Sequence, residues 1–447
     1  MAKAKNTLMD KIVSLSKRKG FVFQSSEIYG GINSCYDYGP LGIELKRNIK
    51  DAWWKSIVTS RDEIEGLDAA ILMHPRIWEA SGHLAGFTDP MIDCKECKAR
   101  FREDKLDDAL CGNRAYQGRK ALKCQAEDKF TDARQFNLMF KTFMGPVESD
   151  ANIVFIRPET AQGIYVNMHN VLLSSRQKVP FGIGQIGKAF RNEITPGNFI
   201  FRTREFEQME MQYFVKPGED DKWFEYWKEQ RMNWHLGMGI TPSKLRFHEH
   251  GEGELAHYAK GAFDIEYEFP FGWQELEGIH NRTDFDLTRH QEHSGKDLRY
   301  YDQQANEKYL PYIIETSAGC DRTLLTILVD AYEEEQLEKD TRVVMRFAPK
   351  VAPIKAGIFP LVKKEGMPEI AHKLKDELKV KYNVFYDESG AVGRRYRRMD
   401  EVGTPFCITI DSETLKDETV TIRERDSMQQ SRVSISKAGA FLAETLE

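Results

Sequence analysis

The chain has 447 residues, of which 41% are hydrophobic and 30% are charged, and its formal net charge is −6. This length exceeds one compact core, so two or three domains are expected, and the composition is that of an ordinary soluble globular protein. The acidic balance argues against a generic nucleic-acid-binding protein. It does not exclude a protein that binds RNA through a local basic surface, because RNA responds to the local field.

The N-terminal residues 1–20 are rich in lysine and amphipathic, with Leu8, Ile12, Val13 and Leu15 at helical spacing. This segment lacks an apolar run of signal-peptide length, and no later segment reaches the length that crosses a membrane. We therefore expect a cytoplasmic protein that does not associate with membranes.

The next elements alternate between helices and strands. The pattern predicts a long helix over 41–59, a strand that ends at Pro75, a strand over 153–156 and a helix over 158–173. Residues 94–150 are charged and poor in hydrophobic side chains for most of their length, which indicates an insertion.

The seven cysteines are odd in number and scattered, so a disulfide framework is not expected. Cys94 and Cys97 have the spacing of a zinc knuckle, with Cys111 and Cys124 as possible partners. A zinc ribbon normally needs a second close pair to present four thiolates, and the downstream cysteines are single. We do not expect zinc at this site.

Two neighbouring strands are predicted around an Arg-x-Glu sequence at 191–193 and an Arg-x-x-x-Phe sequence at 202–206, joined by a Pro-Gly loop. Alternation places Arg191 and Glu193 on one face of the first strand. The same face of the second strand is expected to carry Arg202, Arg204, Phe206, Gln208 and Glu210. Its opposite face is apolar and suits a core, with Met209, Met211, Tyr213 and Val215.

The polar faces of these strands carry the kinds of side chain that bind a nucleoside triphosphate. Guanidinium groups bind phosphate oxygens, an aromatic ring can stack on a base, and a carboxylate accepts from an exocyclic amine. A solvated sheet face alternates in the same way, so the two strands alone leave that alternative open. Further downstream, Glu315, Ser317 and Gly319 again share a strand face, and Arg322 follows where an apolar helix begins.

Between these segments, residues 222–237 are predicted to form a tryptophan-rich helix, and 241–262 form a polar excursion before the sheet resumes at 263–267 and 273–278. An acidic run at 333–340 is expected to separate this part of the chain from the rest. The last hundred residues or so alternate strands with helices, which indicates a small α/β domain. Its expected elements are a helix over 368–378 and strands over 355–362, 384–386, 406–410 and 419–422.

Residues 394–398 form the clearest basic cluster, with four arginines around Tyr396. Basic residues interleaved with an aromatic ring could grip phosphates and stack a base of RNA. The alternative is a surface helix whose arginines are solvated, and the cluster alone favours that alternative.

The Arg-x-Glu and Arg-x-x-x-Phe strands and the segment ending at Arg322 resemble motifs 2 and 3 of class II aminoacyl-tRNA synthetases. Other segments resemble glycyl-tRNA synthetases of the homodimeric, single-chain type, and together they span almost the whole chain: 26–31, 37–42, 52–55, 136–140, 157–163 and 399–406. Residues 72–75 resemble the end of motif 1, whose proline lies at the dimer interface in that class.

The resemblance implies an α+β fold: an antiparallel class II sheet flanked by helices, followed by an α/β anticodon-binding domain. The implied division is a catalytic domain over 1–339, with insertions near 94–150 and 216–262, and an anticodon-binding domain over 340–447. The implied reaction joins glycine to the 3′ end of tRNA(Gly) through glycyl-adenylate, with ATP and Mg²⁺, in a homodimer.

The resemblance also assigns roles. Arg191 would hold the α-phosphate and the glycine carboxylate, Arg322 would stack on adenine opposite Phe206, and Glu275 would hold magnesium; on sequence alone Glu275 is equally a sheet-surface carboxylate. Glu193 would accept from the adenine amine and Arg202 would bind the γ-phosphate. The implied ATP site comprises Arg191, Asn192, Glu193, Phe201, Arg202, Thr203, Arg204, Glu205, Phe206, Glu275, Leu276, Gly319, Cys320, Asp321 and Arg322.

Glycine has no side chain to grip, so its pocket must bind an ammonium and a carboxylate and leave no room for a methyl group. The implied glycine site comprises Arg102, Glu159, Phe206, Glu207, Gln208, Met209, Glu210, Glu315, Thr316, Ser317, Ala318 and Gly319. A glutamate at Glu159 could instead stabilise a helix start. In motif 3, Ser317 agrees with the glycine-specific pattern, whereas Asp321 stands where glutamate is common.

Two other functions remain open from the sequence. One is a class II synthetase with a similar C-terminal domain and another substrate, such as proline or threonine; Glu159, Glu315 and Ser317 argue for glycine. The other is a non-catalytic relative that keeps the fold as a binding module. Such relatives lose the motif arginines, whereas Arg191, Arg202 and Arg322 are all present.

Overall fold

The computed structural model describes residues 7–96, 98–103, 106, 129–194, 197–251, 253, 255, 258–338 and 340–446. The chain begins with helix α1 (Leu8–Lys19), the hairpin of β1 (Val22–Gln24) and β2 (Tyr36–Tyr38), and helix α2 (Pro40–Trp54). A π-helical turn, Lys55–Thr59, extends α2, so the long helix predicted over 41–59 is confirmed.

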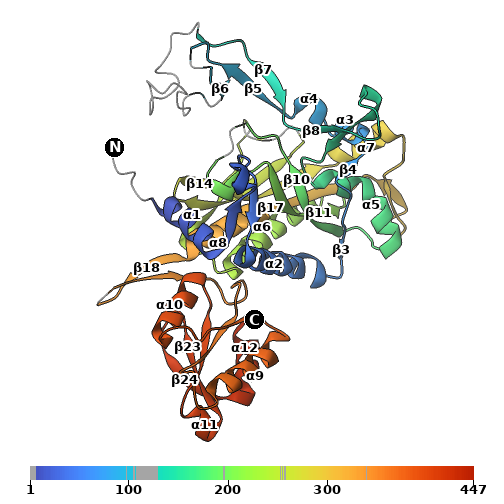
Figure 1. The fold of residues 1–447 in the computed structure, drawn as a ribbon. Helices are drawn as coiled ribbons and strands as arrows, with labels where there is room; N and C mark the ends of the chain where they lie inside the picture. The colour runs from blue at the N-terminus through green and yellow to red at the C-terminus, as the bar shows by residue number, and fades with distance from the viewer. Residues whose placement is uncertain are drawn as a thin grey trace.

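A seven-stranded sheet forms the centre of the molecule, in the order β12-β13-β14-β17-β11-β10-β3 (Figure 1). Every pairing is antiparallel except that of β3 with β10. The strands are β3 (Ile64–Gly66), β10 (Phe181–Phe190), β11 (Glu205–Val215), β12 (Leu245–Glu249), β13 (Gly261–Phe269), β14 (Gly272–Thr283) and β17 (Tyr312–Gly319). The expected antiparallel sheet flanked by helices is therefore present, and the fold is α+β.

Helices cover the apolar face of this sheet. Helices α2, α6 (Asp220–Gly237) and α8 (Cys320–Ala331) pack on it in one hydrophobic core, which includes Met209, Met211 and Tyr213 of β11. A smaller core joins α5 (Ala161–Ser175) and α7 (Phe285–Ser294) to side chains of the other face of the sheet, near one end of its strands. This packing leaves the remainder of that face available for polar side chains.

Two expectations about local structure were wrong, and a third segment contains a strand that was not expected. The expected polar excursion at 241–262 contains β12, an edge strand of the central sheet. The acidic run at 333–340 begins within β18 (Tyr332–Gln336), which pairs with β19 (Thr341–Met345) and leaves Glu333 and Glu334 exposed. Strand β10 ends at Phe190 and β11 begins at Glu205, so Arg191, Glu193, Arg202 and Arg204 lie on the connection rather than on the strands.

Smaller elements surround the motif 1 segment and the expected insertion. Strands β4 (Leu72–Met73), β8 (Phe140–Phe143) and β9 (Ile153–Ile156) form one sheet, and β5 (Thr88–Asp93), β6 (Arg100–Arg102) and β7 (Arg134–Asn137) form another. The second of these sheets extends away from the central sheet (Figure 1). The short elements α3 (Arg76–Ala80), α4 (His83–Gly86), β15 (Tyr300–Asp302) and β16 (Glu307–Tyr309) complete this part.

The C-terminal part has its own sheet and core. The sheet has the order β21-β20-β22-β23-β24, with β20 (Ala356–Pro360), β21 (Val384–Tyr386), β22 (Phe406–Ile410), β23 (Thr419–Glu424) and β24 (Gln430–Ser434). Its helices are α9 (Met367–Lys379), α10 (Val392–Val402), α11 (Thr414–Asp417) and α12 (Ala438–Leu446). The predicted alternation of strands and helices is confirmed, although β24 was not expected.

A buried ionic cluster joins the β18–β19 hairpin to the C-terminal sheet. Asp400 of α10 accepts from Arg342 of β19 at 2.8 Å and from Arg423 of β23 at 2.9 Å and 3.2 Å. The side chains of Arg342 and Asp400 are completely buried. In the same helix, Arg395 is buried and donates to the Pro360 carbonyl, so this arginine of the basic cluster is structural. No helix among the described residues combines the length and the apolar character needed to span a membrane.

Candidate active site

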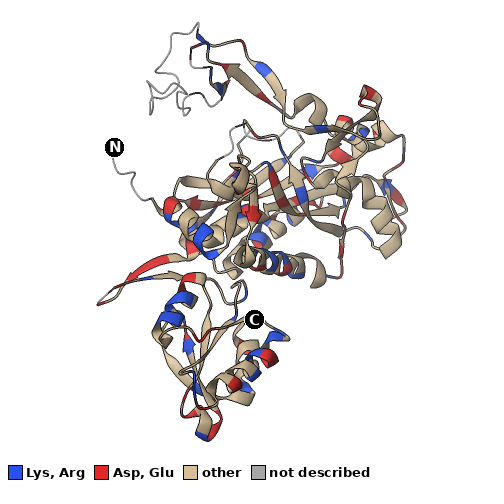
Figure 2. Cartoon of the chain, viewed as in Figure 1, with Lys and Arg blue, Asp and Glu red and all other residues tan. Residues whose placement is uncertain are grey.

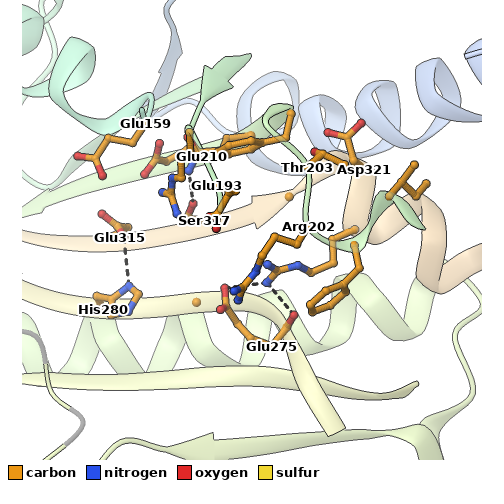
Figure 3. A pocket seen from close by; sticks show the side chains of 18 of the residues that line it. Glu159, Glu193, Arg202, Thr203, Glu210, Glu275, His280, Glu315, Ser317 and Asp321 are labelled. Atoms are coloured by element: carbon orange, nitrogen blue, oxygen red, sulfur yellow. Dashed lines mark hydrogen bonds and ion pairs between the residues drawn. The ribbon is translucent and has the colours of Figure 1, made fainter. Parts of the chain in front are cut away.

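A cavity of about 280 Å³ opens on the polar face of the central sheet. Figure 3 shows that three carboxylates, Glu159, Glu210 and Glu315, lie at one end of it, whereas Arg202 and Glu275 lie at the other. The lining comes from the connection after β10, from β11, β14 and β17, and from the start of α8. Its predicted members are Glu159, Arg191, Glu193, Phe201, Arg202, Thr203, Phe206, Gln208, Glu210, Glu275, Glu315, Ser317, Gly319, Asp321 and Arg322.

Arg191 is held in place from two sides. Its Nε donates to the carbonyl of Pro158 at 3.0 Å, and its guanidinium lies 5.3 Å from the ring centres of both Phe206 and Phe87. These cation–π contacts and the single backbone acceptor leave other donors of the guanidinium for a ligand. A fork of this kind suits an anionic oxygen.

Arg322 and Glu275 form the main ion pair at the opposite end. Nη1 of Arg322 lies 3.1 Å from Oε1 of Glu275 and donates to its backbone carbonyl at 2.8 Å. The guanidinium also lies 4.4 Å from the ring centre of Phe201. The charge of Arg322 lowers the pKa of Glu275, although burial opposes that shift, so the carboxylate is ionised at neutral pH.

Glu315 is the most fully bonded of the three carboxylates at the acidic end. Its Oε2 accepts from Arg282 at 2.9 Å, from Gln212 at 3.1 Å and from Tyr165 at 3.3 Å, and its Oε1 meets His280 at 3.1 Å. Burial would raise the pKa of Glu315, but Arg282 and the His280 hydrogen bond outweigh it and lower the value to about 2. Glu315 is therefore a carboxylate at neutral pH.

The pKa values of Glu210 and Glu159 are shifted in opposite directions. Burial, together with the charges of Glu315 and Glu159, raises the pKa of Glu210 well above its usual value, although Thr160 donates to it. For Glu159 burial also acts to raise the pKa, but His83, Arg282 and Gln162 lower it on balance. This end of the cavity thus carries the negative charge of Glu159 and Glu315, which favours a bound cation.

A β-bulge in β14 explains why one strand contributes to the cavity on both sides of Leu276. The ladder pairs Glu266 with Glu275 but Ile265 with Glu277, so Leu276 is the extra residue. Glu277 consequently points to α6, where it is completely buried with Arg231 at 2.6 Å and His235 at 2.7 Å. Gly278, His280 and Arg282 return to the cavity side.

The sequence reasoning missed several residues that line the cavity, including Tyr258, Gly278, His280 and Arg282. Strict alternation from Glu275 would have placed Glu277 in the cavity and His280 on the opposite face. The clearest available signal was the run of polar residues 280–282 directly after Ile279, near the end of the strand. The stack of Arg282 on Tyr258, 3.8 Å from its ring centre, had no local signal because these residues lie on different elements.

Several predicted residues have side chains that face away from the cavity. Met209, Leu276, Ala318 and Cys320 are completely buried in the main core, and Thr316 is buried on the same side of its strand as Ala318. Glu207 pairs with Lys46 and Lys50 of α2, each at 3.1 Å, on the side of the sheet that the helices cover. These residues can contribute backbone atoms or support, but their side chains do not line the cavity.

The remaining predicted residues lie at its margins. Asp321 accepts from Lys46 at 2.8 Å and from the Glu207 amide at 2.6 Å, which ties α8 to β11. Arg204 donates to the carbonyls of Glu193 and Asn33, Glu205 pairs with Lys188, and the Asn192 amide donates to Leu138. Arg102 pairs with Asp89 at 2.9 Å in the β5–β6–β7 sheet and is not part of the lining.

The zinc expectation concerns residues that are mostly outside the described part of the chain. Cys94 is buried at the end of β5, where it forms a bridge with Phe130. Cys97, Cys111 and Cys124 lie outside the described residues. Among the described residues, no group of three or more His, Cys, Asp or Glu side chains could hold a metal ion.

Two family descriptions match the chain. Residues 146–331 match the tRNA synthetase class II core domain (G, H, P, S and T), and residues 355–445 match the anticodon binding domain. The first match contains the cavity-lining strands, and the second contains the C-terminal sheet.

Relatives of nearly the same length carry the name glycine–tRNA ligase. The one from Treponema denticola is 59% identical, over 95% of this chain and 94% of its own length. The relative from Alkaliphilus oremlandii is 56% identical, over 98% of this chain and 98% of its own length. The relative from Borreliella burgdorferi is also 56% identical, over 97% of this chain and 96% of its own length. With this identity across both the class II core and the anticodon-binding part, the chain belongs to the glycine–tRNA ligase family.

Proposed function

We propose that the cavity on β11, β14 and β17 is the place where this glycine–tRNA ligase activates glycine. The reaction has two steps. The glycine carboxylate attacks the α-phosphorus of ATP to give glycyl-adenylate and pyrophosphate, and a terminal ribose hydroxyl of tRNA(Gly) then attacks the carbonyl carbon and displaces AMP. The first step needs positioning and charge neutralisation more than a covalent nucleophile. The observation that carries the proposal is the meeting of arginines and three carboxylates in one cavity.

The arginine-containing part of the cavity would bind ATP. Arg191, with donors left over from its Pro158 contact, would hold the α-phosphate and the glycine carboxylate as charge develops between them. Phe206 would stack on one face of adenine and Arg322 on the other, with Glu193 accepting from the adenine amine. Arg202 would contact the γ-phosphate. The proposal is supported by the presence of all five side chains in the lining.

The acidic end would bind glycine. Glu159 and Glu315, both ionised, would attract the ammonium group, and Ser317 would close the space that a side chain needs. Glu210 would lose its proton more readily once an ammonium group lies beside it, because the cation offsets the neighbouring carboxylates. Steric closure suits this substrate, since every competing amino acid is larger.

Magnesium fits the ATP end. Mg²⁺ is usually bound through one or two carboxylates together with substrate phosphates rather than by a protein cage. Glu275 offers such a carboxylate, with about half of its side chain exposed. Glu275 would hold the ion, and the ion would neutralise phosphate charge when bound. Arg322, which now pairs with Glu275, would be released toward the nucleotide.

We propose that the two halves of the chain divide the work, with adenylate formation in residues 1–339 and anticodon binding in 340–447. Residues 345–352, however, pack in the main hydrophobic core beneath the central sheet. The structural boundary between the two parts therefore lies later in the chain than the division proposed for their functions. Figure 2 shows the acidic β18 near the basic residues of α10. Of that basic cluster, Arg394 is exposed and remains available for RNA, whereas Arg397 pairs with Asp340 and Arg398 with Asp387.

We further propose that the enzyme is a homodimer that works in the cytoplasm. The support for dimerisation is the motif 1 segment, where Leu72 and Ile71 are exposed apolar side chains next to Pro75. Sedimentation equilibrium should give twice the mass of 51.7 kDa. Exchange of Leu72 for aspartate should shift the mass toward that of a monomer.

ATP–pyrophosphate exchange tests the function directly. The purified chain should support exchange with glycine and not with alanine, serine, proline or threonine. Exchange driven by proline or threonine would assign the chain to a different specificity. No exchange with any amino acid would point to a binding module.

A further inference from the structure

His280 occupies a position inside the cavity for which the proposed reaction gives no role. It lies on β14 directly opposite Glu315 of β17, and its Nδ1 is 3.1 Å from Oε1 of that carboxylate (Figure 3). Both side chains are largely shielded, with 18% and 7% of their surface exposed. Such a contact between cross-strand neighbours fixes the orientation of both groups.

The two oxygens of Glu315 have different surroundings. Oε2 faces three donors, from Arg282, Gln212 and Tyr165. Oε1 faces a single donor, Nδ1 of His280, among the hydrogen bonds of Glu315 described above. An ionised carboxylate oxygen can accept more than one hydrogen bond. Oε1 is therefore the oxygen with capacity left for a ligand.

The proton on His280 follows from the state of its partner. Glu315 has a pKa lowered to about 2, first of all because the Arg282 charge outweighs burial, so at neutral pH it can only accept. The ring must then carry its hydrogen on Nδ1, because Nδ1 is the atom that faces Oε1. The contact is a charge-assisted hydrogen bond from the histidine to the glutamate.

The neighbouring glycine makes room for this ring. A Cβ built on Gly278 would lie 2.7 Å from Cε1 of His280, which is closer than van der Waals contact allows. Any larger residue at 278 would displace the imidazole and with it the donor to Glu315. Gly278 and His280 therefore act as one unit on the cavity side of β14.

We propose that His280 is a positioning residue for substrate recognition: its Nδ1–H holds Glu315 so that Oε1 presents a lone pair to the ammonium group of glycine. The inference rests on the proposed assignment of the acidic end to glycine. His280 touches Glu315 and not the reacting atoms, so its effect should appear in glycine binding. ATP binding, at the other end of the cavity, should not depend on it.

The test compares His280→Ala with His280→Asn, because an asparagine amide can replace the Nδ1 donor at a similar place on the strand. In ATP–pyrophosphate exchange, His280→Ala should raise the KM for glycine about tenfold, as expected for loss of one charge-assisted hydrogen bond, while kcat and the KM for ATP change less than about twofold. His280→Asn should return the glycine KM to within about threefold of the parent value. His372→Ala is the control, since His372 lies in α9 of the C-terminal part, where its ring stacks on Tyr386 outside the cavity lining.

The outcomes separate the alternatives. Equal losses in His280→Ala and His280→Asn would overturn the proposal, because ring volume rather than the donor would then matter. Parallel rises in the glycine and ATP KM would also overturn it. If His280→Ala does not fold, Gly278→Ala is the second variant to measure, and it should raise the KM for glycine. An unchanged KM for glycine would overturn the proposal that Gly278 and His280 act together on Glu315. Absence of glycine-dependent exchange in the parent chain would instead reject the proposed function itself.

Discussion

Arg282 and Glu315 lie on neighbouring strands of the central sheet with Nη1 of the arginine 2.9 Å from Oε2 of the glutamate, and both side chains are almost completely buried. Arg282 also binds Asp286 at 2.8 Å, so its charge is shared. One cation cannot compensate every carboxylate around it, and burial together with the charges of Glu315 and Glu159 raises the pKa of Glu210. The carboxyl groups at this end of the cavity therefore repel one another when no ligand is bound.

This repulsion predicts a stability gain in Glu210→Gln that depends on pH. The folded-state pKa of Glu210 is raised, mainly by burial and then by Glu315 and Glu159, so the folded chain holds a proton that the unfolded chain has lost. The stability that this proton contributes is fully present at pH values below the pKa of Glu210 in the unfolded chain. It is lost as the pH rises through the higher pKa of Glu210 in the folded chain. The variant should match the parent near pH 4.5 and melt at a higher temperature at pH 8, as measured by calorimetry.

The control for this experiment is Glu413→Gln, which removes an exposed carboxylate paired with Lys416. Its melting temperature should follow the parent at every pH. A Glu210→Gln variant that melts below the parent at pH 8 would contradict a raised pKa for Glu210.

Arg191→Ala should abolish glycine-dependent ATP–pyrophosphate exchange without unfolding the protein. Arg191 lies on the connection after β10 and its guanidinium is available in the cavity. Removing one such electrostatic contact typically costs about 3–4 kcal/mol in the transition state, or a factor of several hundred in rate. Lys188→Ala, at an exposed position of β10 just before that connection, should retain exchange. Exchange by Arg191→Ala within threefold of the parent would refute the role.

Glu159→Gln should raise the KM for glycine about tenfold to a hundredfold, with less effect on the KM for ATP, because a charge-assisted hydrogen bond is lost. Helix α5 begins two residues later, and the Glu159 carboxylate meets the side chains of Gln162 at 2.9 Å and His83 at 3.4 Å. Steady-state exchange at varied glycine and ATP measures both constants. Equal losses for the two substrates would return Glu159 to a structural role.

Asp400→Ala should destabilise the junction with the C-terminal part by about 3–5 kcal/mol, since it leaves Arg342 buried without this partner. Thermal unfolding should show an earlier transition, and charging of tRNA should fall more than pyrophosphate exchange does. The exposed pair of Glu413 and Lys416 is again the control, and Glu413→Ala should cost less than about 1 kcal/mol. Equal losses of charging and exchange would argue against a division of work between the two parts.

Regular strands were predictable from the sequence, and their ends were not. Alternation along β11 correctly separated Phe206, Gln208 and Glu210, which line the cavity, from Met209 and Met211, which are buried in the core. It failed at Arg191 and Arg202, because strand pairing stops before these residues and nothing in their chemistry marks that point.

Other failures have a similar physical origin. The glutamates of β18 have the composition of a solvated linker, yet pairing with β19 makes them an edge of a hairpin. Residues contributed by distant elements, such as Tyr258 and Arg282, meet only in three dimensions. The sequence carries the chemistry of each group but not the tertiary contact that brings two of them together.

The extra residue in β14 changes which positions of the strand face the cavity. Before Leu276, odd-numbered positions face the cavity, as Glu275 does; after it, even-numbered positions do, as Gly278 and His280 do. A single strand thereby supplies a carboxylate to the nucleotide end and a histidine to the acidic end, while Glu277 serves α6 on the far side. Deleting Leu276 would remove the bulge, and Glu275, Gly278 and His280 would then follow one another in simple alternation on the cavity side. The extra residue therefore serves the opposite face, where it adds an apolar side chain to the main core next to the ionic group of Glu277.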